Sequence, residues 1–300
     1  MKRKNRDNVA DKTVVGLCTI ICVLFGLFCF MPLWTALVSS FTNEGVLFRE
    51  GYRLWIKDFD LTSYKVIFTG TNDVMSAYLV TIATTAAGVG LTLLLTSSLA
   101  YPLSVPALKY RHRIAFFAYF TMLFNGGLVP NYILTTRLLH MRNSIWVLII
   151  PGALNAYNMF LMRNYFASIP QSLSESAKID GANELRIYWS IILPLAKPIL
   201  ATIGLFAAMG YWNEWYKVLL YIDKRELFTL QFLIMRLQQQ ADFLSSSMNP
   251  MARQALGNVA IPTLGVRLAT AMVSIGPIVL LYPLLQKYFI KGIMIGSVKG

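Results

Sequence analysis

This sequence of 300 residues has little charge, little acid and few of the residues that build catalytic or metal sites. Only 14% of its residues are charged, against about a quarter in soluble domains, while 56% are apolar and the mean hydropathy is +0.55. Lys and Arg outnumber Asp and Glu by 27 to 14. The scarcity of charge predicts that lipid, not water, surrounds most of the chain.

Sites for chemistry are also missing. The sequence contains no G-x-x-x-x-G-K-[ST] loop to cradle phosphates, so the chain is not expected to hydrolyse ATP by itself. Its two histidines, His112 and His140, fall in loops, where neither a nucleophile with its base nor a metal-ligand cluster is assembled. We therefore expect no catalytic residue, no metal and no cofactor bound by this chain.

The three cysteines, Cys18, Cys22 and Cys29, lie in the first apolar run and include no C-x-x-C pair. Their spacing places them near one face of an ideal helix. Packing as small buried thiols is the favoured interpretation, with metal binding or acylation as the alternative. No disulfide framework is indicated.

The excess of positive charge is best explained by membrane spans with basic flanks, because no basic face with interleaved aromatics suggests nucleic acid. A basic start, residues 1–13, precedes an uncharged run from Val14 to Val38. This run is long enough to cross the bilayer and too long for the apolar region of a signal peptide. We interpret it as a first transmembrane helix and an uncleaved anchor.

Further apolar windows predict five more spans, for six in all. They are Met75 to Val105, Ile114 to Thr136, Ile145 to Met162, Pro198 to Leu220 and Leu268 to Gln286. The basic N-terminus, the turn Lys109 to Arg113 and the tail 287–300 then share one side, which the positive-inside rule makes cytoplasmic. The outer turn Arg137 to Asn143 carries two arginines against this rule. Glu214 and Lys217 interrupt the fifth window at a spacing that lets them neutralise each other, so that span ends at Trp212 or continues to Leu220.

Two long loops, about 39–73 and 221–267, fall on the outer side. In the second, Leu227, Leu230, Ile234 and Leu237 recur at helical spacing. This pattern predicts an amphipathic helix, which lies on the outer surface or a partner, or simply covers the bundle.

The cytoplasmic loop of about 163–197 is patterned for structure. Ser172 and Glu175 form an S-x-x-E capping box after Pro170, which predicts the start of a short helix. Asp180 and Gly181 predict a stop or sharp bend. A second helical stretch, Ala182 to Ile192, is expected to end at Leu193 and Pro194. Two short helices joined by a glycine hinge form a docking element that needs a partner.

The run E-S-A-K-I-D-G-A, Glu175 to Ala182, followed by I-I-L-P, Ile191 to Pro194, resembles the EAA loop of ABC-importer permeases. Ser176 replaces the first alanine of that motif, a small-for-small change. The D-G-A form and the long outer loop before the last span are similar to the smaller permease subunit of maltose-type importers. With N-G-G-L-V-P at 125–130 and G-S-V-K-G at 296–300, the chain most resembles permeases of the oligosaccharide and polysaccharide-lipoprotein type.

The resemblance implies an all-α membrane protein with six transmembrane helices, of the ABC type I importer (MetI-like) permease fold, whose core spans about 75–286. It also implies a bacterial cytoplasmic-membrane location and four kinds of partner: a second homologous permease, two cytoplasmic ATPase subunits that hold ATP and Mg, an extracytoplasmic sugar-binding protein and membrane lipid. The implied ATPase-coupling residues are Glu175, Ser176, Ala177, Asp180, Gly181, Ala182, Leu193 and Pro194. Glu175 pairs with a basic group of the ATPase or only caps its helix. The tail residues Ser297, Val298, Lys299 and Gly300 contact the ATPase or fray.

A sugar requires hydrogen-bonding groups and aromatic faces within the spans. The candidates are Asn125, Asn155, Tyr157, Asn158, Tyr211, Trp212, Asn213 and Glu214. The alternative is structural, since Tyr and Trp gather at membrane interfaces and Asn side chains hold helices together.

Two other classes of function fit less well. A secondary transporter needs acids or histidines within its spans for an ion relay, and Glu214 is the only acid in the six windows. A receptor or scaffold does not explain a docking loop of this form.

Overall fold

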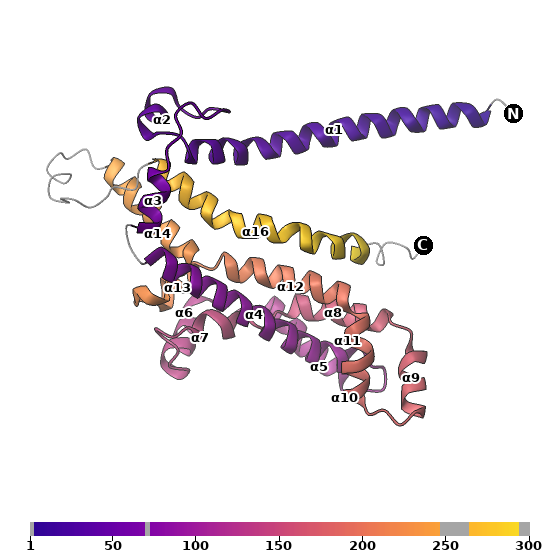
Figure 1. Cartoon of the computed structure of the whole chain (residues 1–300). Coiled ribbons are helices and arrows are strands. Elements are labelled where there is room, and N and C mark those ends of the chain that lie inside the picture. The colour runs from indigo at the N-terminus through magenta and orange to yellow at the C-terminus, as the bar shows by residue number, and fades with distance from the viewer. Residues whose placement is uncertain (1–2, 70–72, 247–263, 294–300) are drawn as a thin grey trace. The chain divides into compact units, whose positions relative to one another are not determined.

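The computed structural model describes residues 3–69, 73–246 and 264–293, which are almost entirely helical (Figure 1). The one β-bridge in these ranges joins Thr42 to Phe59. The chain divides into two compact units, residues 1–71 with 237–273 and residues 72–236 with 274–300. The tail residues Ser297 to Gly300, expected at an ATPase, lie outside the described residues.

The first unit contains the predicted anchor, which is one continuous helix. α1 runs from Arg3 to Ser40, and its stretch Lys12–Ser40 is long and apolar enough to cross a membrane. None of its most apolar window is buried. The expectation of buried thiols is therefore wrong for this chain, because Cys18, Cys22 and Cys29 are all exposed.

The outer loop after α1 is folded against the end of that helix. It contains α2, Glu44–Glu50, and leads into α3, Thr62–Thr69. The Trp34 indole N–H donates to the Leu54 carbonyl at 3.0 Å, and the Phe41 ring stacks on Tyr64 at 4.8 Å. Asp60 accepts hydrogen bonds from the hydroxyl and the backbone N–H of Thr62, and these bonds lower the pKa of Asp60.

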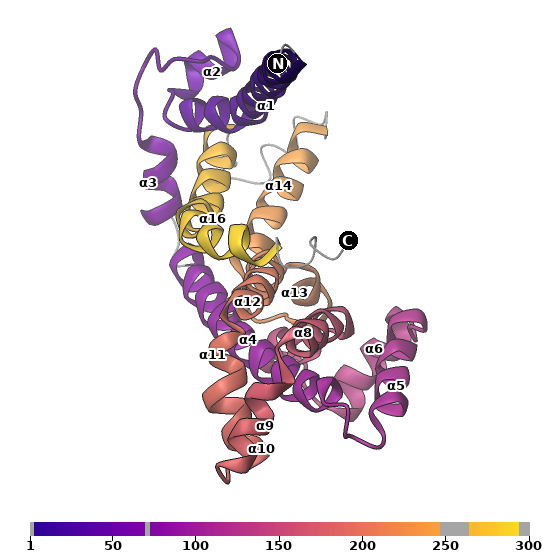
Figure 2. The same cartoon turned by 90° about the vertical axis from the view of Figure 1, so that its right-hand side faces the viewer.

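In the second unit, α4 is the central helix. It runs from Asp73 to Ser104, close to the predicted window, and α8 and α12 pack along it (Figure 2). Gly88 allows the close approach of α12, since a Cβ there would lie 2.5 Å from the Tyr211 ring. Residues of α4, α8, α12 and the stretch before α12 form the main core. Its buried members include Leu103, Met162, Ile187 and Ile203.

The third apolar window, Ile114 to Thr136, holds two helices that meet at a bend, and its crossing of the membrane stays a prediction. α5, Arg111–Leu123, and α6, Leu128–Ile133 with a π-turn to Leu138, meet at 110°. The Asn125 side chain accepts the Gly127 N–H at 2.9 Å, and Gly127 has a φ of +86°. This local turn ends the first helix where the apolar pattern alone would continue it.

The fourth and fifth windows are interrupted as well. α7, Trp146–Ile149, and a 3₁₀ turn, Ile150–Gly152, precede α8, Ala156–Ser168. Pro151 accounts for the first break. In the fifth window α12, Lys197–Trp212, ends at the cap Asn213, and α13 spans Tyr216–Tyr221, so the fifth helix stops at Trp212.

Two helices complete the described chain. After a 3₁₀ turn, Arg225–Leu227, come α14, Leu230–Ser246, and α16, Leu264–Ile293. Leu230 and Ile234 are buried, which favours a helix that covers the bundle over one that lies free on the outer surface.

The number of spans stays a prediction. Among the described residues, Lys12–Ser40 and Val74–Ser104 each have the length and composition to cross a membrane. Two bent pairs, Arg111–Leu138 and Glu184–Trp212, raise the total to four if each is one span. The last helix contributes a shorter apolar stretch, Leu264–Pro277.

Candidate functional site

The predicted docking loop contains a short helix, α9, from Gln171 to Ile179. Its N-cap is Pro170, with no side-chain cap, so the predicted capping box is wrong. The helix begins two residues earlier than that box requires, and Ser172 already lies in the first turn. Glu175 is thus not used as a cap, and its exposed carboxylate has no ion-pair partner in the described part of the chain.

The C-terminus of α9 is closed as predicted at Asp180 and Gly181. Gly181 has a φ of +80°, and its N–H donates to the Lys178 carbonyl at 3.0 Å. The Ala182 N–H donates to the Ala177 carbonyl at 2.9 Å. These two bonds make a Schellman motif, in which a left-handed glycine satisfies the last carbonyls of a helix. The hinge is therefore a defined turn with a fixed geometry.

A pair of polar contacts ties this segment to the central helix of its unit. The Lys178 ammonium lies 2.7 Å from one oxygen of Glu184, and the other oxygen accepts the Tyr101 hydroxyl of α4 at 2.7 Å. Ala177 and Ala182 pack against the main core. Sequence reasoning missed this attachment, although a Lys within the motif and a Glu two residues after it are a signal for it.

The other side of the segment is exposed and apolar. Ile179 is 87% exposed, Leu185 69% and Leu173 43%. Apolar side chains presented beside the unpaired Glu175 carboxylate suit burial against another protein. The loop thus has one side that is attached to the rest of the unit and one side that has no partner in the described part of the chain.

The helical stretch that follows differs from the prediction of Ala182 to Ile192. It begins at Glu184, where the Asn183 side chain caps α10, Glu184–Ile187, and it continues through a π-turn into α11, Leu193–Leu195. The Leu193 N–H reaches back to the Tyr188 carbonyl, one residue further than in an α-helix. The helix ends at Leu195, one residue after Pro194, and the chain bends by 79° before α12, so the end predicted at Leu193 and Pro194 is confirmed to within a residue.

A second candidate site lies where two interrupted helices of the same unit meet. The Lys217 ammonium lies 2.6 Å from the Glu214 carboxylate and 5.8 Å from the centre of the Tyr211 ring. It also lies 3.1 Å from where a Cβ of Gly152 would be. The Tyr211 hydroxyl donates to the Ile149 carbonyl at 2.8 Å. The expected neutralisation of Glu214 by Lys217 is confirmed, and Lys217 itself also approaches the break before α8.

Comparison with known proteins places the chain in a family. Residues 91–295 match the model of the binding-protein-dependent transport system inner membrane component. The chain belongs to this family. Protein LplC of Bacillus subtilis (strain 168) is 36% identical over 90% of this chain and 89% of its own length. The polygalacturonan/rhamnogalacturonan transport system permease protein YtcP of the same organism is 37% identical over 93% of this chain and 95% of its own.

A solved structure gives the same assignment. A chain of a bacterial ABC transporter involved in the import of the acidic polysaccharide alginate is 31% identical, with a TM-score of 0.80. The likeness covers 93% of this chain and 98% of that one. The protein is therefore a multi-pass membrane permease subunit of an ABC importer, with the permease fold that the EAA-like loop suggested.

Most of the proposed sugar-path residues have structural partners in this permease. Asn155 caps α8 by accepting the Asn158 N–H, the Asn213 side chain donates to the Met209 carbonyl, and Asn125 caps the break before α6. The buried Trp212 indole donates to the Ser274 carbonyl at 3.1 Å. These bonds hold the helix ends whether or not a ligand binds.

Tyr157 and Asn158 differ from the other candidates. Tyr157 is 59% exposed and Asn158 is half-buried, and the side chains of both are free of hydrogen bonds in the part of the chain that the structure describes. They follow the break that Lys217 approaches. The candidates thus lie at the ends of interrupted helices. One group is at the start of α8 and consists of Asn155, Tyr157 and Asn158. The other is at the end of α12 and consists of Trp212, Asn213 and Glu214. Asn125 lies at a different break.

Among the residues that the structure describes, no three His, Cys, Asp or Glu side chains are grouped to hold a metal ion. The chemistry available at both sites is ionic, aromatic and hydrogen-bonding. Such groups can bind a sugar or a protein surface without a reaction on this chain.

Proposed function

We propose that this permease imports oligosaccharides and that α9 is the lever through which ATP hydrolysis on partner subunits moves its helices. Glu175, Ser176, Ala177, Asp180, Gly181, Ala182, Leu193 and Pro194 form the coupling segment in this proposal. The observation that carries it is the two-sided build of that segment. The segment is attached to α4 through Lys178, Glu184 and Tyr101, while Ile179 is 87% exposed and the Glu175 side chain is open to solvent.

The attachment matters because α9 can pass a displacement on to α4 only if the junction between them is rigid. The Schellman turn at Gly181 fixes the direction in which the chain leaves α9. The Glu184 contacts then join that turn to the central helix of the unit. Displacement of α9 by a partner would move α4 with it, in the rigid-body manner of alternating access.

The energy source and the orientation follow from the same proposal. Two cytoplasmic ATPase subunits, which bind ATP and Mg, receive α9 in a groove, and Ser297 to Gly300 reach the same subunits. Both termini are then cytoplasmic, as the basic segments 1–13 and 287–300 favour. A second permease completes the path, and an extracytoplasmic binding protein delivers the sugar.

The substrate class is proposed from the relatives and from the helix breaks. YtcP is named for polygalacturonan and rhamnogalacturonan, and the solved importer for alginate. Oligosaccharides that contain uronic acids are therefore the first to test. Tyr157 offers an exposed ring for a sugar face, and the Asn158 amide offers a donor and an acceptor.

Uptake of a labelled uronic-acid oligosaccharide by proteoliposomes that hold the whole importer tests the proposal. Glu175→Lys should abolish uptake because it reverses the charge that α9 presents to the ATPase. Glu226→Lys is the matched control, since Glu226 is also exposed but lies in the 3₁₀ turn Arg225–Leu227, outside the coupling segment. Normal uptake by Glu175→Lys would remove the role of α9. Uptake of no oligosaccharide by the wild-type importer would remove the substrate class.

A further inference from the structure

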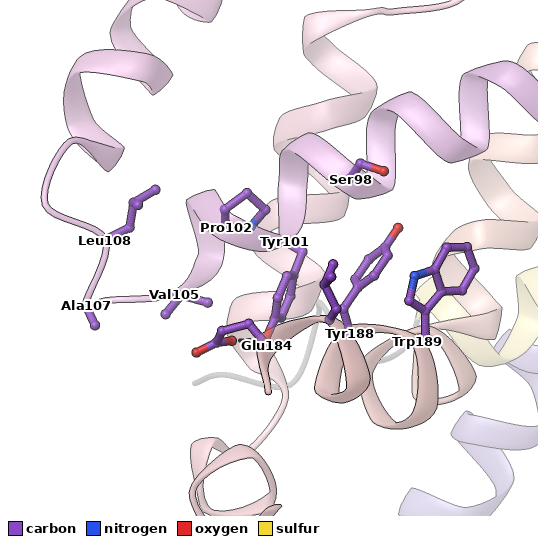
Figure 3. A pocket seen from close by; sticks show the side chains of 10 residues that line it. Ser98, Tyr101, Pro102, Val105, Ala107, Leu108, Glu184, Tyr188 and Trp189 are labelled. Atoms are coloured by element: carbon purple, nitrogen blue, oxygen red, sulfur yellow. Dashed lines mark hydrogen bonds between the residues drawn. The ribbon is translucent and has the colours of Figure 1, made fainter. Parts of the chain in front are cut away.

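A pocket of about 520 Å³ opens beside the coupling segment and has no role in the proposed import cycle. One wall is the end of α4, with Ser98, Tyr101 and Pro102, continued by the turn after it through Val105 and Leu108. The opposite wall is Leu185, Tyr188 and Trp189 of the stretch α10 and its π-turn. Figure 3 shows the rings of Tyr101, Tyr188 and Trp189 in a row along the pocket. Its size lies in the range of small-molecule sites.

The pocket is apolar inside. Its one carboxylate, Glu184, is already bound by Lys178 and by the Tyr101 hydroxyl. The Tyr188 hydroxyl is shared with Ser97 at 2.7 Å. The carboxylate and the hydroxyls of the lining have partners within the protein, and the Trp189 indole is 59% exposed, so a hydrocarbon chain could enter without burying these groups unpaired.

The residues that adjoin the lining in the sequence, here called the rim, are cationic. The residue after Leu108 is Lys109, with Arg111 and Arg113 following, and the residue after Leu185 is Arg186. The described residues place no carboxylate within ion-pair distance of these four side chains, and the contacts seen for Lys109 and Arg113 are with the face of the Tyr110 ring. The segment from Tyr101 to Arg113 contains no acid at all. Charge on the rim therefore favours an anionic head group.

We propose that this pocket binds one anionic phospholipid of the cytoplasmic leaflet. Its acyl chain lies between α4 and the stretch Glu184–Trp189, and its phosphate contacts Lys109, Arg111 and Arg113. This inference rests on the proposed orientation, which puts the turn after α4 at the cytoplasmic face. Basic pockets between membrane helices on that side suit such head groups. Because Glu184 also holds Lys178, the bound lipid adjoins the attachment of the lever.

Trp189 reports directly on the pocket, because it lines the pocket and is 59% exposed. The importer with all its subunits is placed in nanodiscs that contain a phospholipid with a brominated acyl chain, which quenches nearby tryptophan. The Trp189 signal is the difference between wild type and Trp189→Phe. Brominated phosphatidylglycerol should quench it at a mole fraction at least about tenfold lower than brominated phosphatidylcholine, since each cation contributes about fivefold to anion binding.

Variants separate a specific site from ordinary lipid contact. The triple variant Lys109→Gln, Arg111→Gln, Arg113→Gln should remove the preference for phosphatidylglycerol, and Lys109→Gln alone should reduce it about fivefold. A matched triple, Arg137→Gln, Lys224→Gln, Arg225→Gln, changes three exposed cations elsewhere in the unit and should keep the preference. Ala107→Phe, which fills the pocket, should lower quenching by either lipid.

Two results would overturn the proposal. Equal quenching by both lipids at every mole fraction would mean that Trp189 touches only bulk lipid. Quenching by neither, while the signal of the equally exposed Trp146 is quenched, would mean that a partner subunit fills the pocket. Neither result depends on transport, so both are distinct from failure of the coupling proposal.

Discussion

Two lysine–glutamate pairs in this permease have nearly the same geometry and opposite surroundings. Lys178 and Glu184 meet at 2.7 Å with side chains 46% and 54% exposed. Lys217 and Glu214 meet at 2.6 Å with side chains 23% and 15% exposed. An exposed pair contributes little to stability, whereas a buried pair is costly to break from one side. In the proposed mechanism the first pair orients the coupling segment, and the second joins the ends of two broken helices.

The largest expected difference comes from removing one lysine of each pair. Lys217→Met leaves the Glu214 carboxylate, which is 15% exposed, with the backbone N–H of residue 217 as a donor but no ammonium, which should destabilise the protein by about 2–3 kcal/mol. Lys178→Met should cost about 1 kcal/mol or less. Thermal unfolding of the detergent-solubilised importer measures both. The double variant Glu214→Gln, Lys217→Met should regain most of the loss, and equal effects of the two single variants would contradict the comparison.

Substitution at Gly181 should have an intermediate effect on stability and a larger one on transport. Gly181→Val places a branched side chain at a φ of +80°, at a cost of about 1–2 kcal/mol. The Schellman turn should open, which hydrogen exchange at the Ala182 amide would detect as lost protection. Gly181→Asn is the matched control, because Asn tolerates the left-handed region. Wild-type protection in the Val variant would show that the turn does not depend on glycine.

Lys178→Met should reduce coupling more than it reduces stability. The lever remains folded, since the Gly181 turn and the packing of Ala177 do not involve the lysine ammonium. Sugar transported per ATP hydrolysed should fall severalfold, while ATP hydrolysis continues. Lys197→Met, an exposed lysine at the start of α12, should leave that ratio unchanged. An unchanged ratio in both variants would mean that the Glu184 contacts do not transmit motion.

The smallest predicted effect is the response of the two lysine–glutamate pairs to salt concentration. Raising ionic strength from about 0.1 to 1 M shortens the screening length from about 10 to 3 Å, and exposed pairs are screened far more than buried ones. Protection of the amides around Lys178 should therefore fall slightly, while protection around Lys217 should stay constant. A larger loss around Lys217 would show that water reaches the buried pair.

Much of this architecture was predictable from local patterns. The uncharged run from Val14 predicted α1, the window from Met75 predicted α4, and Asp180 with Gly181 predicted the end of α9. Each of these signals resides in neighbouring residues. The pair Glu214 and Lys217 was equally readable, because a three-residue spacing is short enough to be seen in sequence.

The features that the sequence did not predict depend on contacts between residues far apart in the chain, or on turns that the same residues can form in more than one way. Apolar periodicity cannot show that Asn125 ends α5, because a side chain that caps a turn leaves the hydrophobic pattern unchanged. Ser172 and Glu175 matched a capping box, but Pro170 took the cap position. The π-turn Tyr188–Ile192, inside the stretch that ends beside Pro194, also left no mark on the apolar pattern. The bond from Tyr101 to Glu184 joins residues that no local rule relates.

The central claim is that α9 is seated in an ATPase subunit, and a photo-reactive amino acid at position 179 tests it most directly. Ile179 is 87% exposed, so a reactive group there can be introduced without disturbing the core. We predict that light links position 179 to the ATPase subunit in the assembled importer, whereas a probe at the exposed Leu138, on the extracytoplasmic side in the proposed orientation, does not form this link. A probe at position 179 that links only to lipid, or that is reached by reagents added outside the membrane, would contradict the account.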